Sequence, residues 1–238
     1  NNGFVAQINF HAESDSYFPG PDEWGTDGAP GTEGLSTRTS SISQPPLHAT
    51  MVRWMWMRAC RPSADPSVKT FAQKQIRELL PKLLAHHRWW YRARDPNNTG
   101  LVVNIHPWET GMDNSPACDV PLARVPETTR PYTRRDLGHV DASMRPPKSF
   151  YDRVVYLMDF NRAQGFDPQK ILATCPYQVN DIGIISILQR GSIDLIALCE
   201  EFGLKLEASE MAEHVHLTRT IACRPCGPRS GSNSYPET

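Results

Sequence analysis

The feature that most constrains the fold is a succession of apolar segments with helical spacing. The clearest covers Asp181–Gly203, where large aliphatic residues recur every three to four positions and a glycine follows the last of them. Such a stripe is typical of the buried face of an α-helix, and glycine is a common residue just beyond a helix end. The stripe consists of Ile184, Leu188, Leu195, Leu198 and Phe202.

Further helices are expected along most of the chain. Within the helix expected over Ala64–Arg94, Pro81 should kink the helix or split it, because proline cannot donate the backbone hydrogen bond. Leu101–Ile105 is short and β-branched; it is either a strand or a lead into the following loop. Because strands and helices do not alternate, we predict an all-α fold built from helical hairpins. The expected helices cover residues 47–60, Ala64–Arg94, Lys148–Gly165, a short stretch from Asp167-Pro168, and Lys205–Ile221.

The two ends of the chain differ from this helical part. Residues 1–45 are rich in glycine and proline but carry several large aromatic residues, so we predict a long ordered loop that packs on the helices. Residues 223–238 contain mostly small and polar residues, and we expect them to be disordered or foreign to the fold. Cys223 and Cys226 could form half of a zinc site or a redox pair, but no second pair accompanies them. The predicted domain is therefore 1–222.

Composition excludes several classes of function. The formal net charge is -1, which gives no basic surface for nucleic acid. We see no apolar run long enough to cross a bilayer and no signal peptide, so we expect no membrane partner. The 6 cysteines are irregularly spaced, which favours reduced thiols and a cytoplasmic location. Because the chain begins with Asn1 rather than Met, we expect its true N-terminus to be missing; its oligomeric state stays open.

The segment His106–Asp119, His-Pro-Trp-Glu-Thr-Gly-Met-Asp-Asn-Ser-Pro-Ala-Cys-Asp, carries the chemistry. Ser115 and Pro116 are typical of a helix start, so Asp113 lies in the turn before a helix. Taken alone, this placement favours a turn residue whose carboxylate is stabilised by the helix end. For Asp113 to act as a proton donor, desolvation by Trp108 and Met112 must outweigh the helix end.

This segment resembles the active-site motif of the mannosylglycerate hydrolase type of glycoside hydrolase, which is related to processing α-glucosidases and trehalase. Ser43–Pro46, Arg135–Arg145 and Tyr151–Arg153 resemble further segments of that family. The resemblance implies an (α/α)6 barrel, of which about the first half is present, and inverting hydrolysis without cofactor or metal. The implied substrate is a small carbohydrate, an α-linked glycoside such as mannosylglycerate or glucosylglycerate. The alternatives are α-glucosidase or trehalase-like activity, or an inactive fragment that only binds sugar.

The resemblance also implies roles for single residues. Asp113 would be the general acid, Trp108 a wall of the sugar subsite, and Gln44 a hydrogen-bond partner of the sugar. Gly111 would belong to the same substrate-binding loop. The side chains expected to face the leaving group are His11, Tyr17 and Tyr151. Other polar residues of the motif have simpler interpretations: Glu109 and Asn114 brace the loop, and His106 is a structural histidine.

Two departures from the family pattern matter. Cys118 stands where the family usually has tryptophan, and a smaller side chain there should loosen the packing. Inverting hydrolysis also needs a second carboxylate as base, which in the family lies further downstream. We therefore expect the chain to be an internal piece of the barrel, and we expect it to be poorly soluble or to associate when alone. His214 and His216 fall on opposite sides of a helix, which argues against a metal there.

Overall fold

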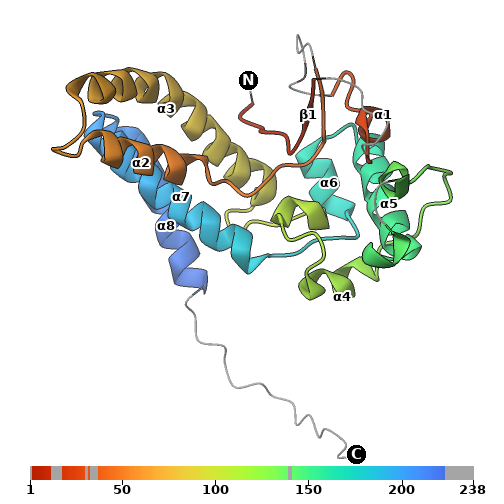
Figure 1. Cartoon of the computed structure of the whole chain (residues 1–238). Helices are drawn as coiled ribbons and strands as arrows, with labels where there is room; N and C mark the ends of the chain where they lie inside the picture. Colours follow the sequence, from red (N-terminus) through yellow and green to blue (C-terminus); the bar gives the residue numbers. More distant parts are fainter. Residues whose placement is uncertain (1, 12–17, 30–31, 33–36, 139–140, 223–238) are drawn as a thin grey trace, which may run out of the picture.

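A computed structural model describes residues 2–11, 18–29, 32, 37–138 and 141–222 (Figure 1). The chain is mostly helical, and its helices form two groups. One contains four long helices, and the other surrounds a helix that follows the 106–119 segment. The elements of the first group are α2 (His48–Ala59), α3 (Pro66–Arg94), α7 (Ile182–Glu201) and α8 (Lys205–Ala222).

Helix α7 is the centre of the first group, because it packs against α8, α2 and α3. Most of its predicted stripe is inside: Ile184, Leu195 and Leu198 are completely buried, whereas Phe202 is half-buried. Gly203 follows the helix with φ +83, a left-handed conformation that favours glycine and explains why the helix ends here. By length and composition α7 could cross a membrane, contrary to our expectation from the sequence, but half of it is buried inside this fold.

Helix α3 begins and continues for clear local reasons. The Asp65 side chain accepts a hydrogen bond from the Ser67 backbone N–H at 2.8 Å, and Pro66 occupies the first helical position. Pro81 lies inside the helix without splitting it, so one of the two predicted outcomes is excluded. The proline is exposed, and the helix is held on its other side by buried residues such as Leu80 and Leu84.

The second group is built around α5 (Lys148–Ala163). Its completely buried residues include Val154, Leu157 and Met158. A two-stranded antiparallel sheet in the N-terminal segment pairs Asn9 with Thr39. The other elements are β1 (Asn9–Phe10), α1 (Pro21–Trp24), β2 (Arg38–Thr39), the 3-10 helices η1 (Pro107–Thr110), η2 (Pro116–Cys118), η3 (Arg135–Gly138) and η4 (Ala142–Met144), and the helices α4 (Asp119–Leu122) and α6 (Pro168–Thr174).

The structure decides two local predictions. Of the two alternatives for Leu101–Ile105, the lead into the following loop is the one observed, since only Asn104 pairs, in an isolated bridge with Val179. At Ser115 a helix does begin, but it is one 3-10 turn followed by the four residues of α4. The dipole of a helix grows with the number of aligned peptide units. An element this short therefore stabilises the Asp113 carboxylate only slightly.

The two ends of the chain are described only in part. The described parts of residues 1–45 contain only short elements, and Trp24 and Ile42 are completely buried in the second group. The predicted tail 223–238, with Cys223 and Cys226, lies outside the described residues.

Candidate active site

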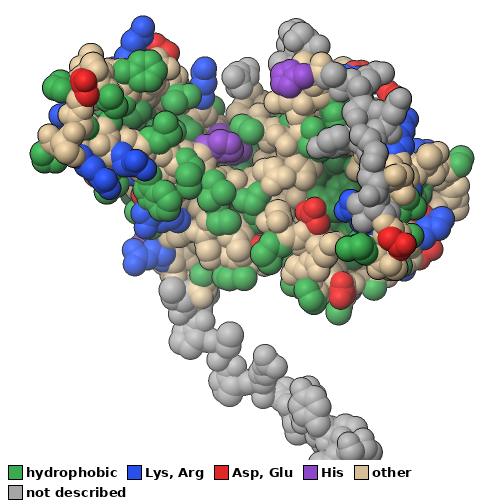
Figure 2. Space-filling model, viewed as in Figure 1, with side chains coloured by type: hydrophobic (Ala, Val, Ile, Leu, Met, Phe, Trp, Pro, Cys, Tyr) green, Lys and Arg blue, Asp and Glu red, His purple; other side chains and the backbone are tan. Residues whose placement is uncertain are grey.

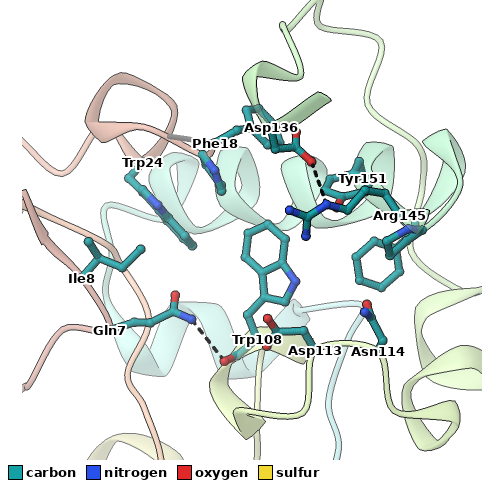
Figure 3. A pocket seen from close by; sticks show the side chains of 13 residues that line it. Gln7, Ile8, Phe18, Trp24, Trp108, Asp113, Asn114, Asp136, Arg145 and Tyr151 are labelled. Atoms are coloured by element: carbon teal, nitrogen blue, oxygen red, sulfur yellow. Dashed lines mark hydrogen bonds and ion pairs between the residues drawn. The ribbon is translucent and has the colours of Figure 1, made fainter. Parts of the chain in front are cut away.

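A cavity of about 370 Å³ opens in the second group of helices (Figure 3). Three stretches that are distant in sequence build it: the N-terminal segment, the 106–119 motif, and the region from η3 to the start of α5. The wall combines aromatic side chains with an equal number of polar or charged ones. The lining residues are Gln7, Ile8, Phe18, Pro19, Trp24, Trp108, Asp113, Asn114, Asp136, Arg145, Pro146, Phe150 and Tyr151.

Trp108 is the central wall of this cavity. It lies on η1, is 8% exposed, and meets the Trp24 ring edge-on with centroids 6.3 Å apart. In Figure 3 its indole stands between Trp24 and Phe18 on one side and Tyr151 and Arg145 on the other, with Asp113 beside its base. Aromatic faces of this kind suit the apolar faces of a sugar ring.

Buried polar contacts fix the start of the motif. The Glu109 carboxylate is completely buried and accepts hydrogen bonds from the Arg94 guanidinium at 2.6 Å and the Ile105 N–H at 3.0 Å. His106 accepts a hydrogen bond from the Trp108 N–H through Nδ1, and its Nε2–H points to the Val154 carbonyl at 3.4 Å. Desolvation lowers the pKa of His106 to about 3, so it is neutral at pH 7. The predicted bracing role of Glu109 and structural role of His106 are confirmed.

Gly111 sets the turn that leads to Asp113. Its φ is +68, and a Cβ there would lie 3.2 Å from Pro45 Cγ and 3.7 Å from Gln44 Oε1. A side chain at this position would therefore be strained and crowded. The turn rests directly on the segment that carries Gln44.

Asp113 faces the cavity. The residue is exposed as a whole, but the surrounding walls remove part of the hydration of its carboxyl group, and this desolvation raises its pKa. Among the described residues, its carboxylate has no hydrogen-bond or salt-bridge partner that would offset the shift. Of the two opposing effects on the pKa of Asp113, desolvation therefore outweighs the helix end. A carboxyl group with a raised pKa can retain a proton and donate it.

A cluster of charges lies across the cavity from Asp113. Arg134 binds the Asp136 carboxylate through two nitrogens, at 2.7 and 2.6 Å, and its guanidinium lies over the Tyr151 ring. Arg145 Nε lies 3.7 Å from Asp136 Oδ2. The hydrogen bonds from Arg134 lower the pKa of Asp136, which is therefore ionised.

The predicted site residues are brought together only in part. Trp108, Asp113 and Tyr151 line the cavity, with Gly111 in the turn before Asp113. Gln44 is half-buried beside Gly111 and does not line the cavity, nor does the exposed His11. Their roles stay predictions. Tyr17 lies outside the described residues. Asn114 lines the cavity. It therefore borders the site as well as the loop that it was predicted to brace.

Sequence reasoning missed several lining residues. Phe18 and Trp24 were noted only as large apolar groups in a loop-rich segment, and Gln7 was not singled out. Asp136 and Arg145 lie in the segment Arg135–Arg145, which resembles the family but to which no site residue was assigned. The presence of both acidic and basic residues in that segment was the available signal.

Two further features bear on the chemistry. Among the described residues no group of three His, Cys, Asp or Glu side chains is arranged to hold a metal ion. Cys118 is 3% exposed and accepts a hydrogen bond from the Tyr177 hydroxyl at 3.2 Å. The completely buried Tyr177 therefore packs beside the small side chain that was expected to loosen this region.

Comparison with known proteins identifies close relatives. The family model described as the mannosylglycerate hydrolase MGH1-like glycoside hydrolase domain matches residues 1–222. The chain is 48% identical over 197 residues to a mannosylglycerate hydrolase of Thermus thermophilus, covering 82% of this chain and 45% of that protein. It is 32% identical over 203 residues to a glucosylglycerate hydrolase of Mycolicibacterium hassiacum, covering 84% and 45%.

A solved structure gives the same relationship in three dimensions. The crystal structure of a GH63 mannosylglycerate hydrolase from Thermus thermophilus, in complex with Tris and D-glycerate, superimposes with a TM-score of 0.80 and 43% identity. The match covers 92% of this chain and 49% of that one. The chain thus spans about half the length of the curated relatives it matches.

Proposed function

The chain belongs to the mannosylglycerate hydrolase MGH1-like glycoside hydrolase family. On that basis we propose that it forms the part of an active site that carries the general acid, and that the substrates are small glycosides in which the sugar is linked to an anionic aglycone. The proposed substrates are mannosylglycerate and glucosylglycerate, after the names of the relatives. The observation that carries the proposal is the position of Asp113, a carboxyl group with a raised pKa in an aromatic cavity that also contains Arg145.

The sugar occupies the aromatic part of the cavity. Trp108 and Trp24 offer apolar surface for the carbon-bound hydrogens of a pyranose ring, and the polar groups around them select its hydroxyls. Gln44 remains a proposed hydrogen-bond partner of the sugar, because it lies next to the turn that holds Asp113.

Asp113 acts as the general acid. It donates its proton to the glycosidic oxygen while the bond to the anomeric carbon breaks, so the aglycone leaves as a neutral alcohol at that oxygen. In an inverting reaction, water attacks the anomeric carbon from the opposite face and a second carboxylate accepts its proton. Asp136 is a poor candidate for that base, because two arginines hold its charge. We assign the base to none of the described residues.

The aglycone lies toward Arg145. Glycerate carries a carboxylate at neutral pH, and Arg145 lines the cavity with a side chain that is 41% exposed. A guanidinium binds a carboxylate through two parallel hydrogen bonds. Tyr151, next to the same cluster, bounds this end of the cavity. Trehalose and oligosaccharides carry no such charge, so Arg145 favours a glycerate glycoside over the α-glucosidase alternative.

We further propose that the fold is about half of an (α/α)6 barrel in a cytoplasmic enzyme. The helical hairpins α2–α3 and α7–α8 and the match to half of a solved glycosidase support the barrel. Exposed apolar residues along α2 and α3 support a surface that further helices would cover (Figure 2). Cys60, Cys118, Cys175 and Cys199 are free, in keeping with a reducing compartment.

A chimera tests the function. Residues 2–222 replace the matching segment of the Thermus thermophilus mannosylglycerate hydrolase, and free mannose is measured after incubation with mannosylglycerate. We expect hydrolysis, with β-mannose appearing first in the NMR spectrum, and loss of hydrolysis in Asp113→Asn. Activity that survives Asp113→Asn would refute the assigned acid, and initial release of α-mannose would refute inversion. A folded but inactive chimera that still binds mannose would favour the alternative of a sugar-binding module.

A further inference from the structure

Asp136 lies between two arginines that differ in how firmly they are held. Arg134 grips its carboxylate with two short hydrogen bonds, whereas Arg145 approaches one oxygen with Nε at 3.7 Å. Figure 3 shows the contact between Asp136 and Arg145 as a dashed line above Trp108. The two arginines thus share one anion, and both approach its Oδ2.

The Arg134–Asp136 pair is a fixed support. Both side chains are largely buried, with 12% and 14% exposed, and the Arg134 guanidinium is stacked on the Tyr151 ring. A guanidinium held in two hydrogen bonds and one stacking contact has little freedom to turn. The carboxylate of Asp136 is therefore a fixed point at this end of the cavity.

Arg145 is the less restrained member of the cluster. Its side chain is 41% exposed, and within the described residues it forms an ion pair with Asp136 alone. Within the described part of the chain, its two terminal nitrogens have no partner. A long, half-exposed arginine loses considerable side-chain entropy when it binds a ligand, unless another group already restrains it.

We propose that Asp136 is a positioning residue that orients Arg145 toward the carboxylate of the aglycone. This inference rests on the proposed function, because it assumes that Arg145 meets an anionic aglycone. Asp136 itself does not bind the ligand, since its charge repels a carboxylate. It acts by restraining Arg145 Nε and leaving the terminal nitrogens directed into the cavity.

Orientation and simple electrostatics predict opposite effects for the loss of Asp136. The cluster of two arginines and one aspartate carries a net positive charge. Neutralising Asp136 makes the cavity more positive, so an anion should bind more tightly if charge alone matters. If orientation matters, the same change should weaken binding despite the added positive charge.

The test measures binding of D-glycerate and of glycerol, in which a neutral CH2OH replaces the carboxylate. The ¹⁵N-labelled 238-residue chain is titrated with each ligand, and the indole N–H signals of Trp24 and Trp108 report occupancy of the cavity. We expect Asp136→Asn to weaken D-glycerate binding roughly tenfold, the order of one charge-assisted contact. Glycerol binding should not change.

Asp159 provides a matched control. It also lies between two arginines, Arg130 at 2.9 Å and Arg162 at 3.4 Å, but it does not line the cavity. Asp159→Asn should therefore leave D-glycerate binding as it is. Retained helical content in the circular dichroism spectra of both variants shows that each is folded.

Arg145→Gln separates this inference from the proposed function. If D-glycerate binds wild type and Arg145→Gln equally, or binds neither, the anionic aglycone in the proposed function is refuted. If Arg145→Gln loses binding while Asp136→Asn binds D-glycerate as well as wild type or more tightly, the proposed function stands and the positioning role is overturned. Weaker binding in both variants, with Asp159→Asn unchanged, supports the inference.

Discussion

Arg94 and Glu109 form a buried ion pair that joins the end of α3 to the active-site motif. Their side chains are 3% and 0% exposed, and the guanidinium Nη2 lies 2.6 Å from the carboxylate. Glu109 also accepts hydrogen bonds from the backbone of Ile105 and, at 3.4 Å, of Ser43. One carboxylate thus fixes three segments next to Trp108.

Glu109→Gln should destabilise the fold by about 3–5 kcal/mol, because it leaves the Arg94 charge buried without its partner. The double variant Glu109→Gln with Arg94→Met should recover part of that loss, since it removes the unpaired charge and Gln can still accept from Ile105. Urea unfolding monitored by tryptophan fluorescence measures both. Strictly additive losses would show that the two charges do not depend on one another.

Mild acid should destabilise the protein through its buried histidines. Desolvation lowers the pKa of His86 to about 4 and of His87 and His106 to about 3, from an ordinary value of 6.5. These groups stay neutral in the fold, whereas the unfolded chain takes up protons below about pH 6.5. Their contribution to stability is therefore complete above pH 6.5 and is lost as the pH falls from there toward 4.

The pH dependence of the melting temperature between pH 7 and 5 tests this prediction. His87→Asn keeps a hydrogen-bonding group near Ser192, which His87 Nδ1 contacts at 3.1 Å, but it cannot titrate. Its melting temperature should fall less steeply over that interval than that of wild type. Parallel curves would count against the role of His87.

Asp113→Asn should make the fold more stable at pH 7. Desolvation raises the pKa of Asp113, so its ionised form opposes folding at pH values above that pKa. Protonation removes the penalty, and the difference between variant and wild type should vanish in acid. Asp119→Asn, at the start of α4, is the comparison: it removes an exposed acidic group from the first turn and should not stabilise. Equal melting temperatures of wild type and Asp113→Asn at pH 7 would contradict the prediction.

The isolated chain should self-associate through α2. Four apolar side chains follow one another at helical spacing and remain 41–69% exposed: Leu47, Met51, Trp54 and Met55. Replacing Trp54 and Met55 by Glu should shift the mass measured by light scattering toward the monomer. Leu206→Glu alters a single leucine that is 84% exposed and should have little effect. A monomeric wild type at high micromolar concentration would disprove the idea.

Helix positions followed from the sequence because their causes are local. The Asp181–Gly203 stripe and the Asp167-Pro168 start each depend on residues within a few positions. Boundaries at Ser115 and Leu101 were less certain, because a good cap does not determine how long a helix continues. Tertiary packing decides that length, and single-sequence patterns do not contain it.

The site was predicted where it is contiguous and missed where it is assembled. Trp108 and Asp113 lie in one recognisable segment, and the cavity confirms that both face the same space. Phe18 and Arg145 reach that space only through the fold. The raised pKa of Asp113 likewise comes from desolvation by neighbours that the linear sequence does not place together.

The assembly of the cavity from distant stretches also has a consequence in time. Its lining extends from Gln7 to Tyr151, so the cavity lacks the wall formed by Arg145 and Tyr151 until the start of α5 has been synthesised and has left the ribosome. Contacts that close long loops form late in folding. During translation, Trp108 and Asp113 emerge after Trp24 but before Arg145 and Tyr151, which complete the wall. The aromatic surface of the future cavity is then accessible to chaperones, and the site is completed only when the start of α5 arrives.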